Sequence, residues 1–443
     1  MPTLRAAPRG PGVPGAGSSR GEAPPAAPSV VRVLVVDDSA VVRGAVGRLV
    51  DAEPDLTVVS TATNGRHALE ALAQHPVDVV VLDVEMPEMD GLTALPLILK
   101  RYPAVRVLML SVHGGRGAEV TVRALALGAA DFVCKPRAGD GAAGAGAGGL
   151  GSRVAVLDAH AAELTRKIRA LGRSAQRVTA RIAERMAERA AHRVARPAGS
   201  APTLGAGPTR TPAGPVPAAA PAPATASAMV PAPGRPLAPG TALPRPRPLE
   251  VLAIAASTGG PVALAELLAA LPPRLGVPVL ITQHMPPDFT RLLAERLGAV
   301  SGLVCAEAQH GEIVQPGRVY VAPGDHHLLV ERRVRDVRVR LTQTPPVNHC
   351  RPAADPMFDA VAAVYGAGTL AVVLTGMGHD GRDGAATIVR RGGRVLAQDE
   401  ATSVVWGMPG AVAQAGHADM VQPIPHLAAH IAACCAARPA GRA

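Results

Sequence analysis

The sequence predicts two α/β domains, a flavodoxin-like domain followed by a doubly wound, mostly parallel α/β domain, joined by a long disordered linker. In both halves of the chain, short apolar runs alternate with stretches of helical periodicity, a pattern typical of parallel sheets covered by helices. The length of 443 residues is enough for two or three domains. Between the halves, residues 197–248 contain fifteen prolines and no acidic residue, so this tract cannot bury a core and is predicted to be extended and mobile.

The first domain follows a tail rich in Pro, Gly and Ala. Its last helix is predicted from Leu164, Ile168 and Leu171, which recur at helical spacing. A Gly/Ala-rich insertion precedes this helix, and an Arg-rich stretch continues it. We therefore divide the chain into a disordered tail at 1–29, a first domain at 30–172 with the insertion at 138–152, an Arg-rich helical extension and linker at 173–248, and a second domain at 249–437.

Polar side chains end four predicted strands of the first domain. Asp37 and Asp38 end one strand, and Asp83 ends another. Clustered carboxylates bind a hard cation such as Mg²⁺ through oxygen, and the cation makes phosphoryl chemistry feasible at an anionic site. Ser111 and Lys135 end two further strands, where a hydroxyl and an ammonium can each contact an added phosphate.

The second domain begins with a candidate nucleophile. Ser257 follows the apolar run 251–256 and precedes Gly259 and Gly260, which allow a tight turn, while Pro261 suits the first position of a helix. A hydroxyl placed there lies at the carboxyl edge of a sheet, near a helix N-terminus that favours developing negative charge. Taken alone, the segment also fits a helix N-cap or a phosphate-binding turn.

His284 and Asp380 end two more predicted strands, at 277–282 and 369–374. Side chains at the carboxyl ends of parallel strands converge on one crevice, where doubly wound sheets bind ligands. There a histidine can take the proton of Ser257 while a carboxylate orients the ring. The order Ser, His, Asp differs from the Ser, Asp, His order of α/β-hydrolases, and no His or Cys spacing resembles a zinc site. Rival bases are His310, His326, His327, His349 and His379.

The first domain resembles the receiver domains of response regulators, and the run DVEMPEMDGLT from Asp83 to Thr93 is similar to the form paired with methylesterases. The resemblance implies that Asp83 accepts a phosphoryl group and that Phe132 is the switch aromatic. The residues it implies around Mg²⁺ are Asp37, Asp38, Asp83 and the carbonyl of Glu85, and those around the phosphoryl group are Ser111 and Lys135.

The second domain resembles the CheB-type chemotaxis protein-glutamate methylesterases, which hydrolyse methyl esters on receptor glutamates. Matching runs include ASTGGP at 256–261, QHMP at 283–286 and TGMGHDG at 375–381. Cys350 stands where the family often has a second His, and Ala353 where it usually has Ser. The roles that the resemblance implies are Ser257 as nucleophile, His284 as general base, Asp380 as orienting acid and the Met377 backbone N–H as part of the oxyanion hole.

The net charge of +10 is concentrated after the first domain. Arginines recur every fourth residue from Arg173 to Arg193, which fits either a solvated helix or a surface that docks on acidic receptor helices.

Aromatic residues make up only 2% of the chain and no recognition motif is present, so specific nucleic-acid binding is not expected. The sequence contains no run of 18 apolar residues, so membrane insertion is not expected. The five cysteines show no paired spacing, which favours a reducing cytoplasm.

We therefore expect a phosphorylation-activated serine hydrolase. Its reaction would convert glutamate methyl esters on chemoreceptors to glutamate and methanol, and it would also deamidate receptor glutamines. The expected partners are methylated chemoreceptors as substrate and a chemotaxis histidine kinase as phosphodonor, with recruitment to receptor arrays. Mg²⁺ is expected for receiver phosphorylation, and no cofactor for the ester chemistry. Alternatives are a methylesterase of a non-chemotaxis pathway and a catalytically degenerate receiver adaptor.

Overall fold

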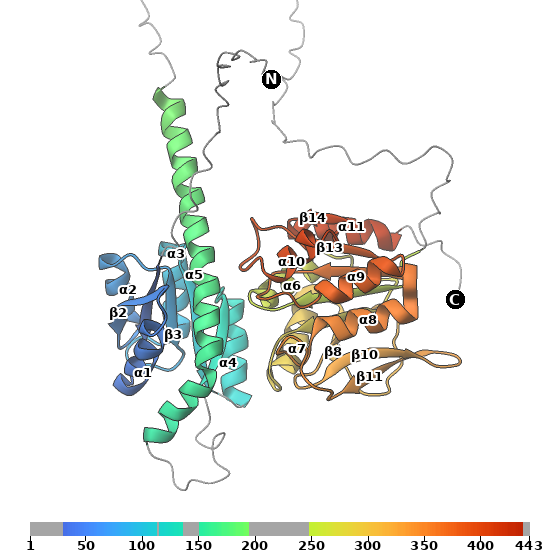
Figure 1. Cartoon of the computed structure of the whole chain (residues 1–443), viewed down its shortest axis with the longest axis horizontal. Coiled ribbons are helices and arrows are strands. Elements are labelled where there is room, and N and C mark those ends of the chain that lie inside the picture. Colours follow the sequence, from blue (N-terminus) through green and yellow to red (C-terminus); the bar gives the residue numbers. More distant parts are fainter. Residues whose placement is uncertain (1–29, 113–114, 136–149, 195–247, 437–443) are drawn as a thin grey trace, which may run out of the picture.

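The structure, a computed structural model, describes residues 30–112, 115–135, 150–194 and 248–436. Two α/β bodies lie side by side, and one long helix runs along the first of them and beyond it (Figure 1). The predicted disordered tail, most of the Gly/Ala-rich insertion and most of the linker lie outside the described residues.

The first body contains a five-stranded sheet in the order β2-β1-β3-β4-β5, with every pair parallel. This confirms the predicted flavodoxin-like sheet. Every residue of β3 is buried, as expected for a strand with helices on both faces of its sheet. The elements are β1 Val31–Val36, α1 Ala40–Asp51, β2 Leu56–Ala62, α2 Gly65–Gln74, β3 Val79–Asp83, α3 Gly91–Arg101, β4 Arg106–Val112, α4 Gly115–Ala126 and β5 Asp131–Lys135.

One helix, α5, extends from Leu150 to Val194. It begins inside the predicted insertion and continues without a break across the boundary predicted at 172/173. Leu164, Ile168 and Leu171 are buried in the core of the first body, which confirms that face of the helix. Every residue from 179 to 189 is exposed, and this part of α5 projects past the sheet (Figure 1).

The second body contains a seven-stranded parallel sheet in the order β14-β13-β12-β6-β7-β9-β8 and an antiparallel hairpin, β10-β11. The three strands predicted to carry the reactive groups are direct neighbours, as β12-β6-β7. The elements are β6 Val251–Ala256, α6 Gly260–Ala269, β7 Val279–Gln283, α7 Phe289–Ser301, β8 Val304–Glu307, β9 Arg318–Val321, β10 His327–Arg332, β11 Val337–Thr342, α8 Ala354–Tyr365, η1 Gly366–Gly368, β12 Thr369–Val373, α9 Arg382–Arg390, β13 Arg394–Gln398, α10 Met408–Gln414, β14 Met420–Gln422 and α11 Ile424–Ala436.

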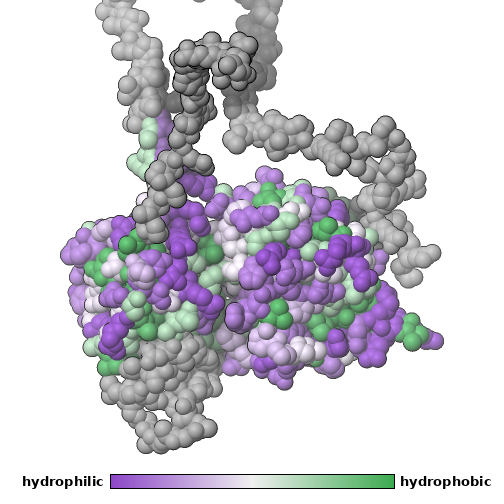
Figure 2. All heavy atoms as spheres, in the orientation of Figure 1, coloured by the Kyte–Doolittle hydropathy of each residue, from purple (hydrophilic) through white to green (hydrophobic). Residues whose placement is uncertain are grey.

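The two bodies meet where α4 lies against α6 and α7. Farther along the chain, Arg177 of α5 pairs with Glu400 at 3.5 Å, and Arg181 donates to the Ala401 carbonyl at 3.3 Å. The visible surface is mostly hydrophilic, with hydrophobic residues scattered over both bodies (Figure 2). Among the described helices, none combines the length and the apolar character needed to span a membrane.

Candidate active site

The turn that presents Ser257 depends on two glycines. Gly259 has a φ of 78°, in the left-handed region that favours glycine, and a Cβ there would lie 2.7 Å from the Val404 side chain. A Cβ on Gly260 would lie 2.0 Å from Oε1 of Gln283. The amide nitrogen of buried Gln283 donates to the Ser257 carbonyl at 3.0 Å and so fixes the turn to the end of β7. The Ser-Thr-Gly-Gly run is therefore fitted closely between strand, loop and helix.

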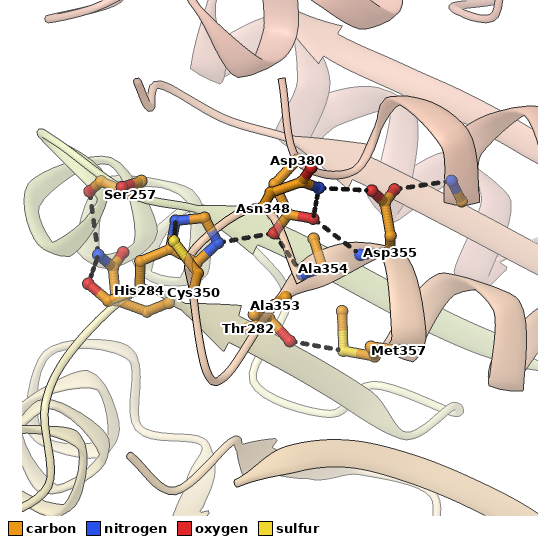
Figure 3. A network of polar contacts seen from close by, with 12 residues as sticks. Ser257, Thr282, His284, Asn348, Cys350, Ala353, Ala354, Asp355, Met357 and Asp380 are labelled. Atoms are coloured by element: carbon orange, nitrogen blue, oxygen red, sulfur yellow. Dashed lines mark hydrogen bonds and ion pairs between the residues drawn. The ribbon is translucent and has the colours of Figure 1, made fainter. Parts of the chain in front are cut away.

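His284 and Asp380 are brought together from strands on either side of β6. Nε2 of His284 lies 2.7 Å from Oδ2 of Asp380 (Figure 3), and the side chains are 10% and 2% exposed, respectively. Burial opposes the charge on His284, but hydrogen bonds to Asp380 and Cys350 outweigh it and raise its pKa to about 10. For Asp380, burial is likewise outweighed by its donors, chiefly His284, and its pKa falls well below the usual range. A histidine and a carboxylate in this arrangement can act as a base and its orienting group.

Asp380 accepts hydrogen bonds on both oxygens. The backbone N–H of Ala354 donates to Oδ2 at 2.5 Å, and the N–H of Asp355 donates to Oδ1 at 3.2 Å. Nδ2 of Asn348 also donates to Oδ1, at 3.1 Å (Figure 3). A carboxylate with this many donors stays ionised in a buried position. Asp380 is thereby fixed as an acceptor for His284.

The loop that carries Asp380 also lies against the serine. A Cβ on Gly376 would lie 2.9 Å from Cβ of Ser257, so the absence of a side chain lets the two segments approach. The N–H of Met377, the next residue, makes no hydrogen bond to any described residue. Met377 and Ser257 line one cavity of about 530 Å³. An unpaired backbone donor beside a serine can stabilise an oxyanion.

The same cavity is lined by His284 and Cys350, and by Phe132 and Lys167 of the first body. Sγ of Cys350 lies 3.4 Å from Nδ1 of His284. Among the described residues, the ring of His284 has no hydrogen bond to the Ser257 hydroxyl. In this state the nitrogen that would take the serine proton faces a thiol.

Among the described residues, none of the rival histidines pairs with Asp380, although His349 and His379 line the same cavity. Both ring nitrogens of buried His327 are occupied, by the Pro345 carbonyl and the Ala353 N–H, each at 3.2 Å. His310 is exposed and accepts from the Leu341 N–H. Of the candidates weighed in the sequence, His284 is the histidine paired with Asp380.

The structure brings the acidic residues that follow β1 and end β3 together. Oxygen atoms of Asp37, Asp38 and Asp83 all lie within 4.8 Å of one another, a donor set that suits Mg²⁺. Lys135 bridges two of these carboxylates, at 2.8 Å from Asp37 and 2.7 Å from Asp83. Burial, opposed by Lys135 and reinforced by Asp37, raises the pKa of Asp83 to about 6. A cation would offset the crowding of negative charge.

The two other residues predicted at this cluster lie differently. Ser111 is buried at the end of β4, where its hydroxyl contacts the hydroxyl of Thr121 and the Gly117 carbonyl of α4. Glu85 is exposed, and its side chain is not among the clustered carboxylates, in keeping with a role for its carbonyl alone.

The first body contacts the serine turn directly. The hydroxyl of Thr258, next to the candidate nucleophile, donates to Oδ2 of Asp131 at 2.5 Å, and the Gly259 N–H donates to the Ala130 carbonyl at 2.9 Å. Beside them the rings of Phe132 and Phe289 stack, with centroids 4.7 Å apart. We call these contacts the interdomain seam, formed by Ala130, Asp131 and Phe132 on one side and Thr258, Gly259 and Phe289 on the other.

Several site residues escaped the sequence analysis. Gln283, Asn348 and Asp355 act on the triad candidates through hydrogen bonds, not through reactive groups of their own. The available signals were weak: Gln283 precedes His284, and Asp355 is an acid in the first turn of α8. Nothing in the motifs indicated that Asp131 would contact Thr258, 127 residues away.

Comparison with known proteins agrees with this geometry. A family model described as CheB methylesterase matches residues 252–431, and the response regulator receiver domain model matches residues 33–141. A protein-glutamate methylesterase/protein-glutamine glutaminase of Maricaulis maris is 45% identical over 90% of this chain and 94% of its own. A second, from Paramagnetospirillum magneticum, is 43% identical over 92% of this chain and 97% of its own.

Among solved structures, the catalytic domain of Thermotoga maritima CheB methylesterase is 42% identical, with a TM-score of 0.41, and the match covers 42% of this chain and 98% of that one. Both domain models match in the order receiver, then esterase, and the relatives align along nearly their whole length. The chain therefore belongs to the CheB methylesterase family and carries a response regulator receiver domain in front of the esterase domain.

Proposed function

We propose that this chain is a phosphorylation-activated protein-glutamate methylesterase, which hydrolyses glutamate methyl esters on a protein substrate to glutamate and methanol. The observation that carries the proposal is the His284–Asp380 pair, 2.7 Å apart, in one cavity with Ser257. The relatives at 41–45% identity are named for this activity and for glutamine deamidation.

The proposed reaction begins with the Ser257 hydroxyl. Its oxygen bonds to the ester carbonyl carbon while Nδ1 of His284 takes its proton, and Asp380 stabilises the imidazolium that forms. The Met377 N–H stabilises the negative charge that develops on the carbonyl oxygen. His284 then protonates the departing methoxide, and methanol leaves an acyl-enzyme.

Water completes the cycle. His284 takes a proton from the water, whose oxygen attacks the acyl carbon, and the proton returns to Ser257 as the glutamate carboxyl group is released. A primary amide at the same position leaves as ammonia by the same steps. Deamidation of glutamine is accordingly a second activity of the same site.

The receiver supplies the regulation. We assign Asp83 as phosphoacceptor and Asp37, Asp38 and Asp83, with the Glu85 carbonyl, as the residues that would hold Mg²⁺. The ion supplies positive charge against which a phosphoryl group can be transferred to a carboxylate. Ser111 and Lys135 are assigned to contact the added phosphoryl group. Nζ of Lys135 already lies 2.7 Å from Oδ1 of Asp83, the carboxylate that would carry the phosphoryl group.

The interdomain seam connects the two activities. In the unphosphorylated chain the receiver covers the cavity with Phe132 and Lys167, and its residues Ala130 and Asp131 hold the turn next to Ser257. Movement of Phe132 on phosphorylation would break the seam and open the cavity.

The partners follow from the reaction. We assign methylated chemoreceptors as the substrate, a chemotaxis histidine kinase as the phosphodonor, and receptor arrays in the cytoplasm as the place of action. The exposed Arg-rich part of α5 suits either a solvated helix or a surface for acidic receptor helices.

The test is methanol release from methylated receptor, with and without a small phosphodonor and Mg²⁺. We expect release from the parent chain to rise with the phosphodonor, and the Asp83→Asn variant to keep basal release without the rise. A chain that binds receptor but releases no methanol under either condition would support the adaptor alternative instead.

A further inference from the structure

A short turn before α8 contacts both members of the His284–Asp380 pair. The turn is closed by two hydrogen bonds between Val347 and Cys350, at 3.1 and 2.9 Å. Asn348 and His349 inside it have φ values of 51° and 65°, a left-handed conformation that costs free energy for residues other than glycine. Such strain persists only where the surroundings fix the segment.

At one end of this turn, the Asn348 amide lies between two carboxylates. Nδ2 donates to Oδ1 of Asp380 at 3.1 Å and to Oδ2 of Asp355 at 2.9 Å (Figure 3). The two protons of an amide nitrogen are thus both directed at buried carboxylates. At the other end, Sγ of Cys350 lies 3.4 Å from Nδ1 of His284. One turn therefore reaches the acid and the base.

Asp355 explains why the amide points this way. Its side chain is buried, and Oδ1 accepts from the Gly384 N–H of α9 at 2.7 Å, while Oδ2 is left for Asn348. Because an ionised carboxylate only accepts, Asp355 favours the amide orientation that turns NH₂ toward it and hence toward Asp380. A second buried carboxylate beside Asp380 is unfavourable for stability alone.

We propose that Asn348 and Asp355 are positioning residues of this esterase, which together hold the Asp380 carboxylate in the orientation that binds His284. The inference rests on the proposed function. Without Asn348, Oδ1 of Asp380 would keep only the weaker contact at 3.2 Å to the Asp355 N–H, and the carboxylate could rotate away from Nε2. Neither residue takes part in bond making.

Two substitutions separate this role from a purely structural one. Asn348→Gly removes the amide, and glycine suits the left-handed backbone. Asn348→Asp keeps the shape of the side chain and tolerates that backbone, but it places a third carboxylate next to those of Asp355 and Asp380. We expect kcat for a soluble methyl-ester peptide to fall about 10-fold or more in Asn348→Gly and further in Asn348→Asp, since hydrogen bonds to charged groups are the stronger ones. If the turn mattered only for folding, Asn348→Gly and Asn348→Asp would both resemble the parent, and Asn348→Ala would be the damaging change.

A second measurement does not depend on turnover. In full-length protein with ¹⁵N-labelled histidine, the pKa of His284 should fall in Asn348→Gly and in Asp355→Asn, because a loosened or less negative partner stabilises the imidazolium less. If the parent chain releases no methanol but the two variants show these shifts, the proposed function is wrong and the positioning role is retained. A His284 pKa and a kcat that both match the parent in Asn348→Gly overturn the positioning role.

Discussion

Single residues decide the chemistry, because the proposed reaction depends on three side chains that come from three neighbouring strands. Ser257, His284 and Asp380 follow β6, β7 and β12, and the order of these strands in the sheet places the serine between base and acid. The geometry depends on the order of the strands in the sheet and not on the order of the three residues along the chain. A chain with the order Ser, His, Asp can therefore serve a function that other folds achieve with a different order.

The first prediction concerns the nucleophile and the base. We expect Ser257→Ala and His284→Ala each to lower methanol release by about 10⁴-fold or more, since each removes a group that acts in every turnover. His310→Ala is the matched control, because that histidine is exposed and its ring accepts a hydrogen bond from the Leu341 N–H of the hairpin. Far-ultraviolet circular dichroism checks that all three variants fold. Turnover near the parent rate in Ser257→Ala would end the serine mechanism.

The second prediction concerns pH. The base must be neutral to accept a proton, and the pKa of His284 is raised to about 10 by its partners despite burial. Hence kcat/KM for a soluble ester should increase as pH rises above the ordinary histidine range, and the increase should continue past neutrality. Asp380→Asn removes the strongest of the raising partners and should move this limb of the profile to lower pH. A limb centred at or below pH 6.5 in the parent would contradict the assignment.

At the scale of elements, the interdomain seam joins two loops that carry different activities. The strand end that holds Ala130 and Asp131 belongs to the receiver, and the turn that holds Thr258 and Gly259 belongs to the esterase. Lys167 of α5 supports the receiver side, at 3.3 Å from Oδ1 of Asp131 and 5.4 Å from the centroid of the Phe132 ring. The receiver side of the seam is therefore contacted by the same helix that packs on the receiver core.

The third prediction tests the seam. Phe132→Ala removes one ring of a stacked pair, a contact that contributes about 0.5–1.5 kcal/mol beyond its buried area. Esterase activity without phosphodonor should therefore rise by about 2- to 12-fold. Tyr102→Ala, an aromatic residue of the receiver at the end of α3, should leave basal activity at the parent level. Equal basal activity in the Phe132 and Tyr102 variants would show that the stack does not restrain the esterase.

The elements that could be predicted from the sequence were those with local signals. Buried strands such as 251–256 read as apolar runs, and their carboxyl ends could be matched to reactive residues because parallel strands share an edge. The Asn348 turn and Asp355 could not be found in this way, since their contacts with Asp380 span 32 and 25 residues and depend on how α8 packs. The unbroken course of α5 from Leu150 was hidden by the glycines and alanines at its start.

At the scale of the whole molecule, the receiver covers part of the cavity that contains Ser257, so its removal should expose the site. We expect deletion of residues 1–248 to raise basal turnover of a soluble methyl-ester peptide above that of the unphosphorylated full-length chain. The phosphodonor should then have no further effect. A truncated enzyme as slow as the unphosphorylated parent would argue that the receiver activates the esterase and does not merely cover it.

The small size of the seam limits the dynamic range of the signal. In the described part of the chain, the seam consists of two hydrogen bonds and one ring stack, and phosphorylation has to outweigh these together with the packing of α4 on α6 and α7. Couplings between sites in proteins typically amount to about 1–3 kcal/mol, which corresponds to about 5- to 150-fold activation. A stronger seam would lower the background but could leave the phosphorylated enzyme still closed. This enzyme should consequently show measurable basal turnover at all times, and its output should follow the level of phosphorylation in a graded manner across the population.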